Sequence, residues 1–287
     1  MKRVLAAVPF LGVLAGTAVA QEGANWQAER DAVTATALDY MEGALNADAD
    51  RMARAVHPEL TKVIIRTYPQ VGRQYLSYNT STTLVEVVRG IAERMADVDK
   101  HADVTVFDIG NDMAVARAIG QLWYDFMQLA KIDGQWRIVN VLWANNRLEA
   151  EDQTGVVPEP GDSARIVTTA LNYIDGSFSG DAGRMESALH PELTKMWLRV
   201  HGGTGRQFLQ KMGAADLIEG TRAGLGTVDE AERNIEVEIY DISHGLAAVK
   251  VTSSRYIDHL QVGRFNGEWM IINVLWVPNP DRPRRGG

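Results

Sequence analysis

The sequence repeats itself at one constant spacing. The octapeptide at 55–62, Ala-Val-His-Pro-Glu-Leu-Thr-Lys, returns at 188–195 as Ala-Leu-His-Pro-Glu-Leu-Thr-Lys, so His57 matches His190 at a shift of 133 positions. The register holds from about residue 36 to residue 143 without a gap, with roughly a third of the positions identical. A repeat of this length indicates a duplicated folding unit. We therefore expect two copies of one domain.

The limits of the two copies follow from composition. Residues 144–162 contain charged residues, proline and glycine without periodicity, which is typical of a linker. The expected division of the chain is a signal peptide (1–20), a first repeat (25–146), a linker (147–162), a second repeat (163–279) and a disordered tail (280–287).

The start of the chain has the features of a secretory signal peptide. Two basic residues precede an apolar run over 4–19, which proline and glycine interrupt and which ends in Ala-Val-Ala. The run is too short and too broken for a comfortable membrane span, and no second run of that length follows. We expect a periplasmic or secreted protein with no membrane span after cleavage. An uncleaved anchor is the alternative.

Composition excludes several classes of site. The chain has no cysteine, so disulfides, thiol catalysis and cysteine-ligated zinc are excluded. The formal net charge is −8 and no basic stripe is present, which argues against nucleic acid as a partner. No histidine pair has the spacing of metal ligands on a helix, so neither a metal nor a cofactor is expected.

Each copy begins with helical patterns and ends with strands. Apolar residues recur at helical spacing near 37–45 and 170–178, and a short second helix should end before His57-Pro58. A third helix is expected near 81–94, with Ser81 or Thr82 as its cap. A long strand over 113–131 returns over 135–143 through Asp133-Gly134, a dipeptide that favours two-residue turns. Helices followed by antiparallel strands, twice over, indicate an α+β fold.

The hairpin carries a family resemblance. The string Asp-Phe-Met-Gln-Leu-Ala-Lys-Ile-Asp-Gly-Gln-Trp-Arg-Ile-Val at 125–139, with His-Pro after the second helix, resembles the NTF2-like superfamily. Within it, the chain is most similar to the SnoaL-like group named putative lumazine-binding, and the resemblance covers both repeats. It implies two cystatin-like cones, each a curved antiparallel sheet wrapped on about three helices with a pocket at the wide end. Members include isomerases, cyclases, dehydratases and binding proteins, so the fold does not select the chemistry.

The hairpin turn sorts the strand residues into two faces. If Asp133 and Gly134 form the turn, directly opposed residues share a face. The predicted pocket face then carries Trp123, Asp125, Met127, Leu129, Lys131, Trp136, Ile138, Asn140 and Leu142. Its counterpart in the second copy carries Tyr256, Asp258, Leu260, Trp269, Ile271, Asn273 and Leu275. An Asp and an Asn thus fall on the same apolar face in both copies.

Asp125 and Asp258 are the foremost candidates for a functional site. A carboxylate on a buried apolar surface is costly unless it is paired or hydrogen-bonded. In a pocket it could serve as a general acid or base, or anchor a polar ligand. The structural alternative is that backbone N–H groups or a neighbouring Arg or His satisfy it.

Histidine and tyrosine side chains extend this candidate site. His57 and His190 suit proton transfer near neutral pH, or simply bond a helix carbonyl. Tyr40 and Tyr173 fall on the inner face of the first helix of their repeats, where each hydroxyl reaches the pocket or stays in the core. His57, Asp125 and Tyr40 together would form an acid–base set.

Two loop arginines complete the candidates. Arg73 and Arg206, each in a Gly-Arg-Gln loop, either bind an anionic ligand or pair with an aspartate, and pairing is the favoured interpretation. The predicted ligand-binding set is Trp123, Asp125, Met127, Asn140, Arg73, His190, Tyr256, Asp258, Asn273 and Arg206.

The opposite face of the hairpin is also apolar. Tyr124, Phe126, Val139, Val141 and Trp143 are unsuited to face water on an antiparallel sheet. Because NTF2-like domains commonly pair through their sheets, we expect the two copies to pack through these faces as an intramolecular pseudo-dimer. A homodimer of whole chains is the alternative.

Three functions fit these observations. The first is an exported protein that binds a small apolar or aromatic molecule in each domain. The second is a cofactor-independent isomerase, dehydratase or cyclase that uses Asp125 and His57 for proton transfer. The third is a structural or assembly module without a ligand.

Overall fold

The computed structural model describes residues 14–146 and 156–281. The expected signal peptide falls mainly outside the described residues, and its last part, residues 14–20, lies in the first helix. Most of the expected linker and of the expected tail also falls outside them. Asp162, placed at the end of the linker by sequence, is instead the first residue of a helix. No helix in the described ranges is long and apolar enough to cross a membrane.

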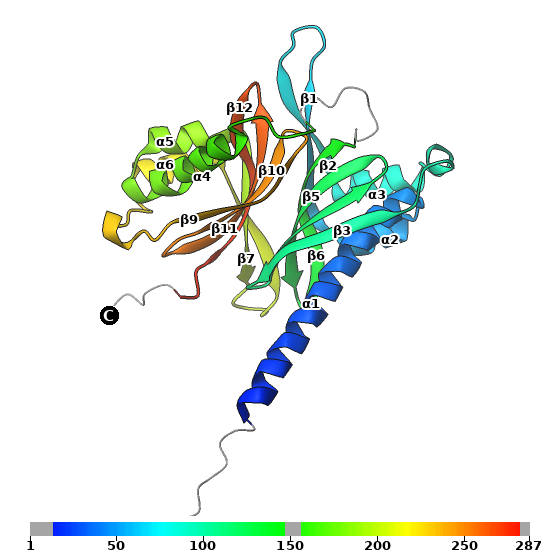
Figure 1. Cartoon of the computed structure of the whole chain (residues 1–287), viewed down its shortest axis with the longest axis horizontal. Coiled ribbons are helices and arrows are strands. Elements are labelled where there is room, and N and C mark those ends of the chain that lie inside the picture. Colours follow the sequence, from blue (N-terminus) through cyan, green and yellow to red (C-terminus); the bar gives the residue numbers. More distant parts are fainter. Residues whose placement is uncertain (1–13, 147–155, 282–287) are drawn as a thin grey trace, which may run out of the picture.

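The first domain contains three α-helices and six strands among the described residues (Figure 1). Its elements in chain order are α1 (Leu14–Leu45), α2 (Ala49–Ala55), β1 (Val56–Thr67), β2 (Gln74–Thr80), α3 (Ser81–Arg89), the short η1 (Glu93–Met95), β3 (Ala102–Gly110), β4 (Met113–Gly120), β5 (Trp123–Ile132) and β6 (Gln135–Asn145).

The second domain repeats this order element by element. It contains α4 (Asp162–Ser179), α5 (Ala182–Ala188), β7 (Leu189–Val200), β8 (Gln207–Gly213), α6 (Ala214–Arg222), the short η2 (Glu230–Glu232), β9 (Glu236–Ser243), β10 (Leu246–Thr252), β11 (Tyr256–Phe265) and β12 (Glu268–Pro278). The expected duplication and the α+β class are confirmed.

The sheets are mixed rather than wholly antiparallel. The strand orders are β2-β1-β6-β5-β4-β3 and β8-β7-β12-β11-β10-β9. β1 runs parallel to β6, and β7 runs parallel to β12, whereas the other neighbours are antiparallel. The second helix of each domain ends before His-Pro, as expected, but the expectation of a wholly antiparallel sheet was wrong because the His-Pro segment itself belongs to a strand that runs parallel to the last strand. The segment lies within the first strand of each sheet.

Two further local expectations need correction. The long strand expected over 113–131 is two strands, since β4 ends at Gly120 and β5 begins at Trp123. The cap of α3 is Thr80, whose hydroxyl accepts from the N–H of Thr83 at 3.2 Å, and not Ser81 or Thr82. The expected hairpin turn at Asp133-Gly134 is present, with φ values of 48° and 82°.

A β-bulge in each hairpin changes which residues share a face. Near the turn, Leu129 opposes Ile138 as expected, but the register then shifts, so Gln128 opposes Asn140 and Asp125 opposes Trp143. The second hairpin shifts in the same way, with Gln261 opposite Asn273. The extra residue moves the side chains beyond it in β6 and in β12 to the opposite face of the sheet.

The bulge therefore corrects the predicted faces. Val141 and Trp143 belong to the core under the helices, with Met127 and Ile138. Leu142, expected on that face, packs in a cluster with Tyr124 and with residues of the second domain. Trp276 likewise packs against the helical core of the second domain.

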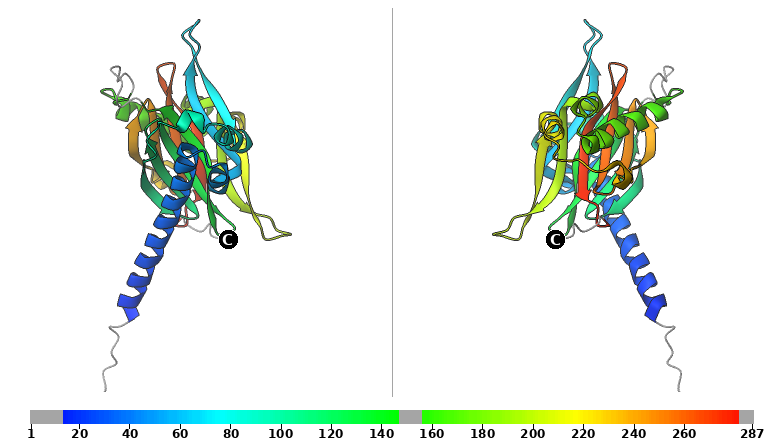
Figure 2. Two further views of the ribbon diagram at one scale, coloured as in Figure 1. Left: turned by 90° about the vertical axis from the view of Figure 1, so that its right-hand side faces the viewer. Right: turned by 90° about the vertical axis from the view of Figure 1, so that its left-hand side faces the viewer.

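The helices of each domain cover one side of its sheet. In Figures 1 and 2, α1–α3 and α4–α6 lie on the outer sides, with the two sheets between them. The core of the first domain joins α1 residues such as Met41 to strand residues such as Leu129. Phe178 and Leu260 have the same relation in the second.

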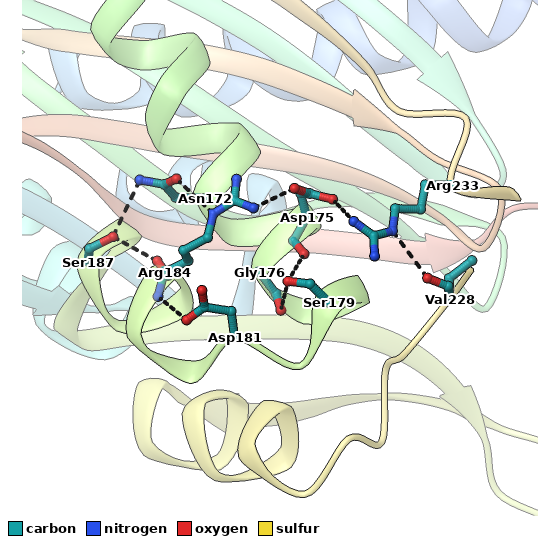
Figure 3. Close-up of polar contacts among 9 residues, drawn as sticks. All are labelled: Asn172, Asp175, Gly176, Ser179, Asp181, Arg184, Ser187, Val228 and Arg233. Atoms are coloured by element: carbon teal, nitrogen blue, oxygen red, sulfur yellow. Dashed lines mark hydrogen bonds and ion pairs between the residues drawn. The ribbon is translucent and has the colours of Figure 1, made fainter. Parts of the chain in front are cut away.

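Arginines fasten the second helix of each domain to the first. Arg184 of α5 pairs with Asp175 of α4 at 2.5 Å, and Arg233 contacts the other carboxylate oxygen of Asp175 (Figure 3). In the first domain Arg51 pairs with Asp39 at 2.7 Å and with Glu42 at 2.6 Å. These bridges connect the paired helices that cover each core.

Side chains of the two domains contact each other on the side away from the helices. One apolar cluster joins Tyr124 and Phe126 of the first domain to Leu246 and Ile272 of the second. A second cluster joins residues of β4, β5 and β6 to residues of β7, β8 and β12. Whether these contacts form a stable pair in solution stays a prediction.

Two glutamines bind the main chain of the opposite domain. Gln128 Nε2 donates to the carbonyl of His259 at 2.7 Å, and Gln261 Nε2 donates to the carbonyl of Phe126 at 2.9 Å. Asn140 and Asn273 each donate to the amide oxygen of the glutamine in their own domain, both at 2.8 Å. The bulge makes this possible because it places both amide side chains on the junction side.

His259 is buried at this junction. It occupies the position that the apolar Phe126 has in the first domain. Asp108 Oδ2 lies 3.6 Å from His259 Nε2 and 2.7 Å from Lys250 Nζ, and it accepts from Tyr240 at 3.1 Å. Burial lowers the pKa of His259 to about 4 from an ordinary value of 6.5, and Lys250 adds to this while Asp108 opposes it.

This histidine predicts an acid-sensitive stability. Below pH 6.5, His259 binds a proton in the unfolded chain but stays neutral in the folded chain. The free energy of unfolding should therefore fall between about pH 6.5 and pH 4. The contribution is on the order of 3 kcal/mol, since one pKa unit corresponds to about 1.4 kcal/mol. Urea denaturation across this range measures it. His259→Phe, the residue at the matching position, should flatten this part of the profile, and an unchanged slope would contradict the assignment.

Candidate functional site

The same four residue types meet in the helix-covered interior of each domain. In the first domain α1 supplies Tyr40, β1 supplies Lys62, β5 supplies Asp125 and β6 supplies Trp143. The matching residues of the second domain are Tyr173, Lys195, Asp258 and Trp276. We call these groups the first and the second interior cluster.

One carboxylate oxygen is the centre of the first cluster. Asp125 Oδ2 accepts from the Tyr40 hydroxyl at 2.7 Å and from Lys62 Nζ at 3.0 Å. Lys62 Nζ also contacts the Tyr40 hydroxyl oxygen. The side chain of Lys62 is 7% exposed and that of Asp125 is fully buried, so this ion pair lies in the core of the domain.

The second cluster reproduces this geometry. Asp258 Oδ1 accepts from the Tyr173 hydroxyl and from Lys195 Nζ, each at 2.8 Å. Lys195 Nζ also donates to the Tyr173 hydroxyl oxygen at 2.5 Å. The duplication has therefore kept the contacts as well as the residue types.

Each tryptophan covers the lysine from the neighbouring strand. Lys62 Nζ lies 4.5 Å from the centre of the Trp143 ring, and Lys195 Nζ lies 4.6 Å from that of Trp276. Trp143 is the direct cross-strand partner of Asp125 because of the bulge. A cation over an indole face gains attraction that is strongest where water is excluded.

Burial sets the protonation of the cluster. It raises the pKa of Tyr40 well above its usual value, and the charge and hydrogen bond of Asp125 act in the same direction. Burial likewise raises the pKa of Tyr173. Both hydroxyls therefore keep their protons at neutral pH and act as donors. Burial lowers the pKa of Lys62, and the neighbouring Asp125 opposes that shift.

The cluster leaves one acceptor and one donor unused in each domain. Within the described ranges, Asp125 Oδ1 and Trp143 Nε1 are buried and have no hydrogen-bond partner. Asp258 Oδ2 and Trp276 Nε1 are in the same condition. An unsatisfied buried polar group costs about 1–3 kcal/mol. Each interior cluster thus contains one unsatisfied acceptor and one unsatisfied donor.

The structure separates the predicted acid–base set. Tyr40 and Asp125 meet, as the hydrogen bond between them shows. His57 does not join them: its Nδ1 accepts from the N–H of Glu59 at 3.1 Å. Burial lowers the pKa of His57, and Lys211 and Arg137 add to this shift while Glu59 opposes it. His190 has the equivalent bond to Glu192 at 3.1 Å. Both histidines lie on strands, and within the described residues neither bonds a helix carbonyl.

Asn140 and Asn273 do not belong to the interior face. The prediction that they share it with the aspartates was wrong, because the bulge turns both amides to the junction and into bonds with Gln128 and Gln261. The other aromatic and apolar candidates do line the helix-covered cores: Trp123, Met127 and Tyr256.

The loop arginines lie away from the interior clusters. Arg73 is exposed beyond the end of β1. Arg206 Nε lies 3.4 Å from Asp133 Oδ2, so Arg206 pairs with an aspartate, as favoured from the sequence. That aspartate belongs to the turn of the opposite domain rather than to the interior.

Sequence reasoning missed four of the eight cluster residues. Lys62 and Lys195 end the repeated octapeptide, and Trp143 and Trp276 end the repeated Asn-Val-Leu-Trp string. Identity at the repeat spacing was therefore the signal that could have found them. Among the described residues, no group of His, Cys, Asp or Glu is arranged to hold a metal ion.

The family model described as "putative lumazine-binding" matches residues 28–144 and again residues 162–277. The chain belongs to this family. The two matched segments contain all eight residues of the interior clusters. No curated protein matches the chain.

Several solved structures are similar to the chain. An NTF2-like protein of unknown function from Shewanella baltica OS155 is 21% identical, with a TM-score of 0.33, over 42% of this chain and 96% of that chain. One from Methylobacillus flagellatus KT is 19% identical, with a TM-score of 0.35, over 44% and 98%. An NTF2-like protein from Novosphingobium aromaticivorans is 16% identical, with a TM-score of 0.33, over 49% and 95%.

A double-mutant cycle tests the interior ion pair. Lys62→Met leaves the Asp125 carboxylate buried without its cation and should lower the free energy of unfolding by about 3–5 kcal/mol. Adding Asp125→Leu removes the stranded charge, so the double variant should be more stable than the single one. Chemical denaturation of both measures the difference. A double variant that is less stable than Lys62→Met would contradict a buried charged pair.

Proposed function

We propose that this member of the putative lumazine-binding family is an exported protein that binds one small molecule at the interior cluster of each domain. The observation that carries the proposal is the unpartnered pair of Asp oxygen and Trp N–H, which recurs in both copies. A ligand with a hydrogen-bond donor and an acceptor on one edge would satisfy both atoms. The family description, which names lumazine, supports a small ligand.

Divergence around the clusters supports a role beyond packing. Leu45 and Met127 of the first domain correspond to Phe178 and Leu260 of the second, so the apolar surroundings have changed. All four cluster positions have stayed the same. Well-packed apolar residues often replace a buried ion pair without loss of stability. Retention of the pair in both copies therefore favours a ligand that uses it.

Binding fits the cluster better than proton transfer does. The acid–base set expected from the sequence is incomplete, because His57 lies outside the cluster. The hydroxyl of Tyr40 is held protonated and already donates to Asp125. A lysine that is covered by an indole ring and bonded to a carboxylate suits fixed recognition of a polar edge.

Native mass spectrometry of the protein purified from its own host, without detergent, tests the proposal. We expect a bound mass at up to two copies per chain. Asp125→Asn should remove one site and Asp258→Asn the other, while Asp103→Asn, at an exposed carboxylate, should remove neither. The same preparation reports the mass of the processed N-terminus, and an unprocessed terminus would contradict export.

Lumazine titration supplies a defined probe. Quenching of tryptophan fluorescence should follow binding near Trp143 and Trp276. Each Asp→Asn change should weaken its own site about tenfold or more, since a hydrogen bond to a charged group contributes about 1.5–3 kcal/mol. An apo mass together with no response to lumazine would refute the binding proposal.

We further infer that the two domains form an intramolecular pseudo-dimer and that the chain is a monomer. The reciprocal glutamine bonds and the mixed apolar clusters support this. Light scattering during gel filtration should give the mass of one chain. Nuclear spin relaxation should give one common tumbling time for both domains. Separate tumbling times would refute the pseudo-dimer, and a doubled mass would favour pairing of whole chains.

A further inference from the structure

A crevice lies where the second strand of the first domain meets the second domain. It is bounded by β2, by the start of β7 and by the β11–β12 hairpin, and its volume is about 440 Å³. Small-molecule sites typically measure about 300–1,000 Å³. The crevice is separate from the interior clusters, so its role does not depend on theirs.

Reciprocal hydrogen bonds hold the two sides of the crevice together. The N–H of Gln74 donates to Asn266 Oδ1 at 2.9 Å, and the N–H of Asn266 donates to Gln74 Oε1 at 2.5 Å. The hairpin of β11 and β12 therefore cannot move away from β2 without loss of both bonds. The crevice is a preformed feature of the junction.

His190 gives the crevice one well-defined polar group. It is 4% exposed, and its Nδ1 accepts from the N–H of Glu192 at 3.1 Å. Burial lowers the pKa of His190, against the opposing charge of Glu192. The neutral ring therefore carries its proton on Nε2, since Nδ1 serves as an acceptor. Nothing in the described part of the chain accepts that proton.

The walls of the crevice are aromatic and apolar. Phe265 packs edge to face on His190, with 4.5 Å between the ring centres, and Tyr75 stacks on Tyr68 at 4.2 Å. Met270 and Leu76 also line the crevice. Flat aromatic bodies pack well against such surfaces.

The charges of the lining residues disfavour an anionic ligand in the crevice. The charged residues that line the crevice are both acidic, Glu192 and Glu268. Glu192 already forms a hydrogen bond with Tyr78. Burial and this hydrogen bond raise the pKa of Tyr78. A carboxylate or phosphate ligand would meet two like charges and no cation.

The matching junction on the other side of the molecule differs in these properties. The positions of Met270 and Tyr78 are taken there by Arg137 and Lys211. Lys211 pairs with Glu59 at 3.2 Å and donates to the carbonyl of Glu59 at the same distance. Burial lowers the pKa of His57, and both cations add to that shift while Glu59 opposes it. His57 thus has two cations near it besides Glu59, whereas the charged residues that line the crevice at His190 are both acidic.

We propose that the crevice at His190 binds a small uncharged aromatic molecule whose carbonyl oxygen accepts a hydrogen bond from His190 Nε2. The ring of the ligand lies against Phe265 and Tyr75, and the two glutamates exclude anionic relatives. The matching junction, with Arg137 and Lys211, does not bind it.

Nuclear magnetic resonance of the histidine side chains of the mature chain tests this inference, with benzamide as the probe and benzoate as its anionic match. Benzamide should shift the His190 ring signals to saturation and leave those of His57 unmoved. Benzoate should bind at least about tenfold more weakly, a difference of about 1.4 kcal/mol.

Met270→Arg supplies a variant that leaves His190 intact, because it introduces the residue that the matching junction already tolerates. It should weaken benzamide at least about tenfold, whereas Arg137→Met should not. Asp125→Asn should leave the benzamide-dependent shift of the His190 signals unchanged, which separates this site from the interior clusters. Equal shifts at His57 and His190, no saturable shift with benzamide, or full affinity in Met270→Arg would each overturn the proposal.

Discussion

A one-residue bulge in each long hairpin governs the chemistry of both sides of the sheet. Residues alternate between the faces of a strand, so a single extra residue moves every later side chain to the opposite face. The shift between Leu129 and Gln128 places Trp143 beside Asp125 in the interior and Asn140 beside Gln128 at the junction. Without it the indole would face the other domain and the amide would face the helices. The interior clusters and the glutamine bonds depend on the same local irregularity.

Much of the fold could be predicted from the sequence, because its signals are local. Two-residue hairpin turns of this type require positive φ, which Asp133-Gly134 and Asn266-Gly267 both adopt. The parallel pairing of β1 with β6 was hidden, since partner choice between strands depends on tertiary packing that no short pattern records. The bulge was hidden for a related reason. Arg137-Ile138-Val139 reads as regular strand, and only the packing of two faces reveals the additional residue.

The site was predictable in part. Tyr40 and Asp125 were identified from helical spacing and from an acidic residue among apolar ones. Lys62 was missed because lysine is almost never fully buried unless paired, and its partner lies 63 positions away in sequence. Trp143 was assigned to the wrong face by the unshifted register. Comparison of the two copies is more informative than either alone, because all four positions of the interior cluster are identical in both copies.

The apolar junction face of the first domain has a consequence for synthesis. Tyr124 and Phe126 are covered by residues between 246 and 272, which a ribosome makes more than a hundred residues later. Until then a folded first domain exposes this apolar sheet face to solvent. Exposed apolar surface of this kind promotes aggregation of nascent chains. If the chain crosses a membrane unfolded, both halves emerge on the far side and can meet at once. Transport of the chain before it folds would therefore avoid a state in which the first domain is folded and its apolar face is uncovered.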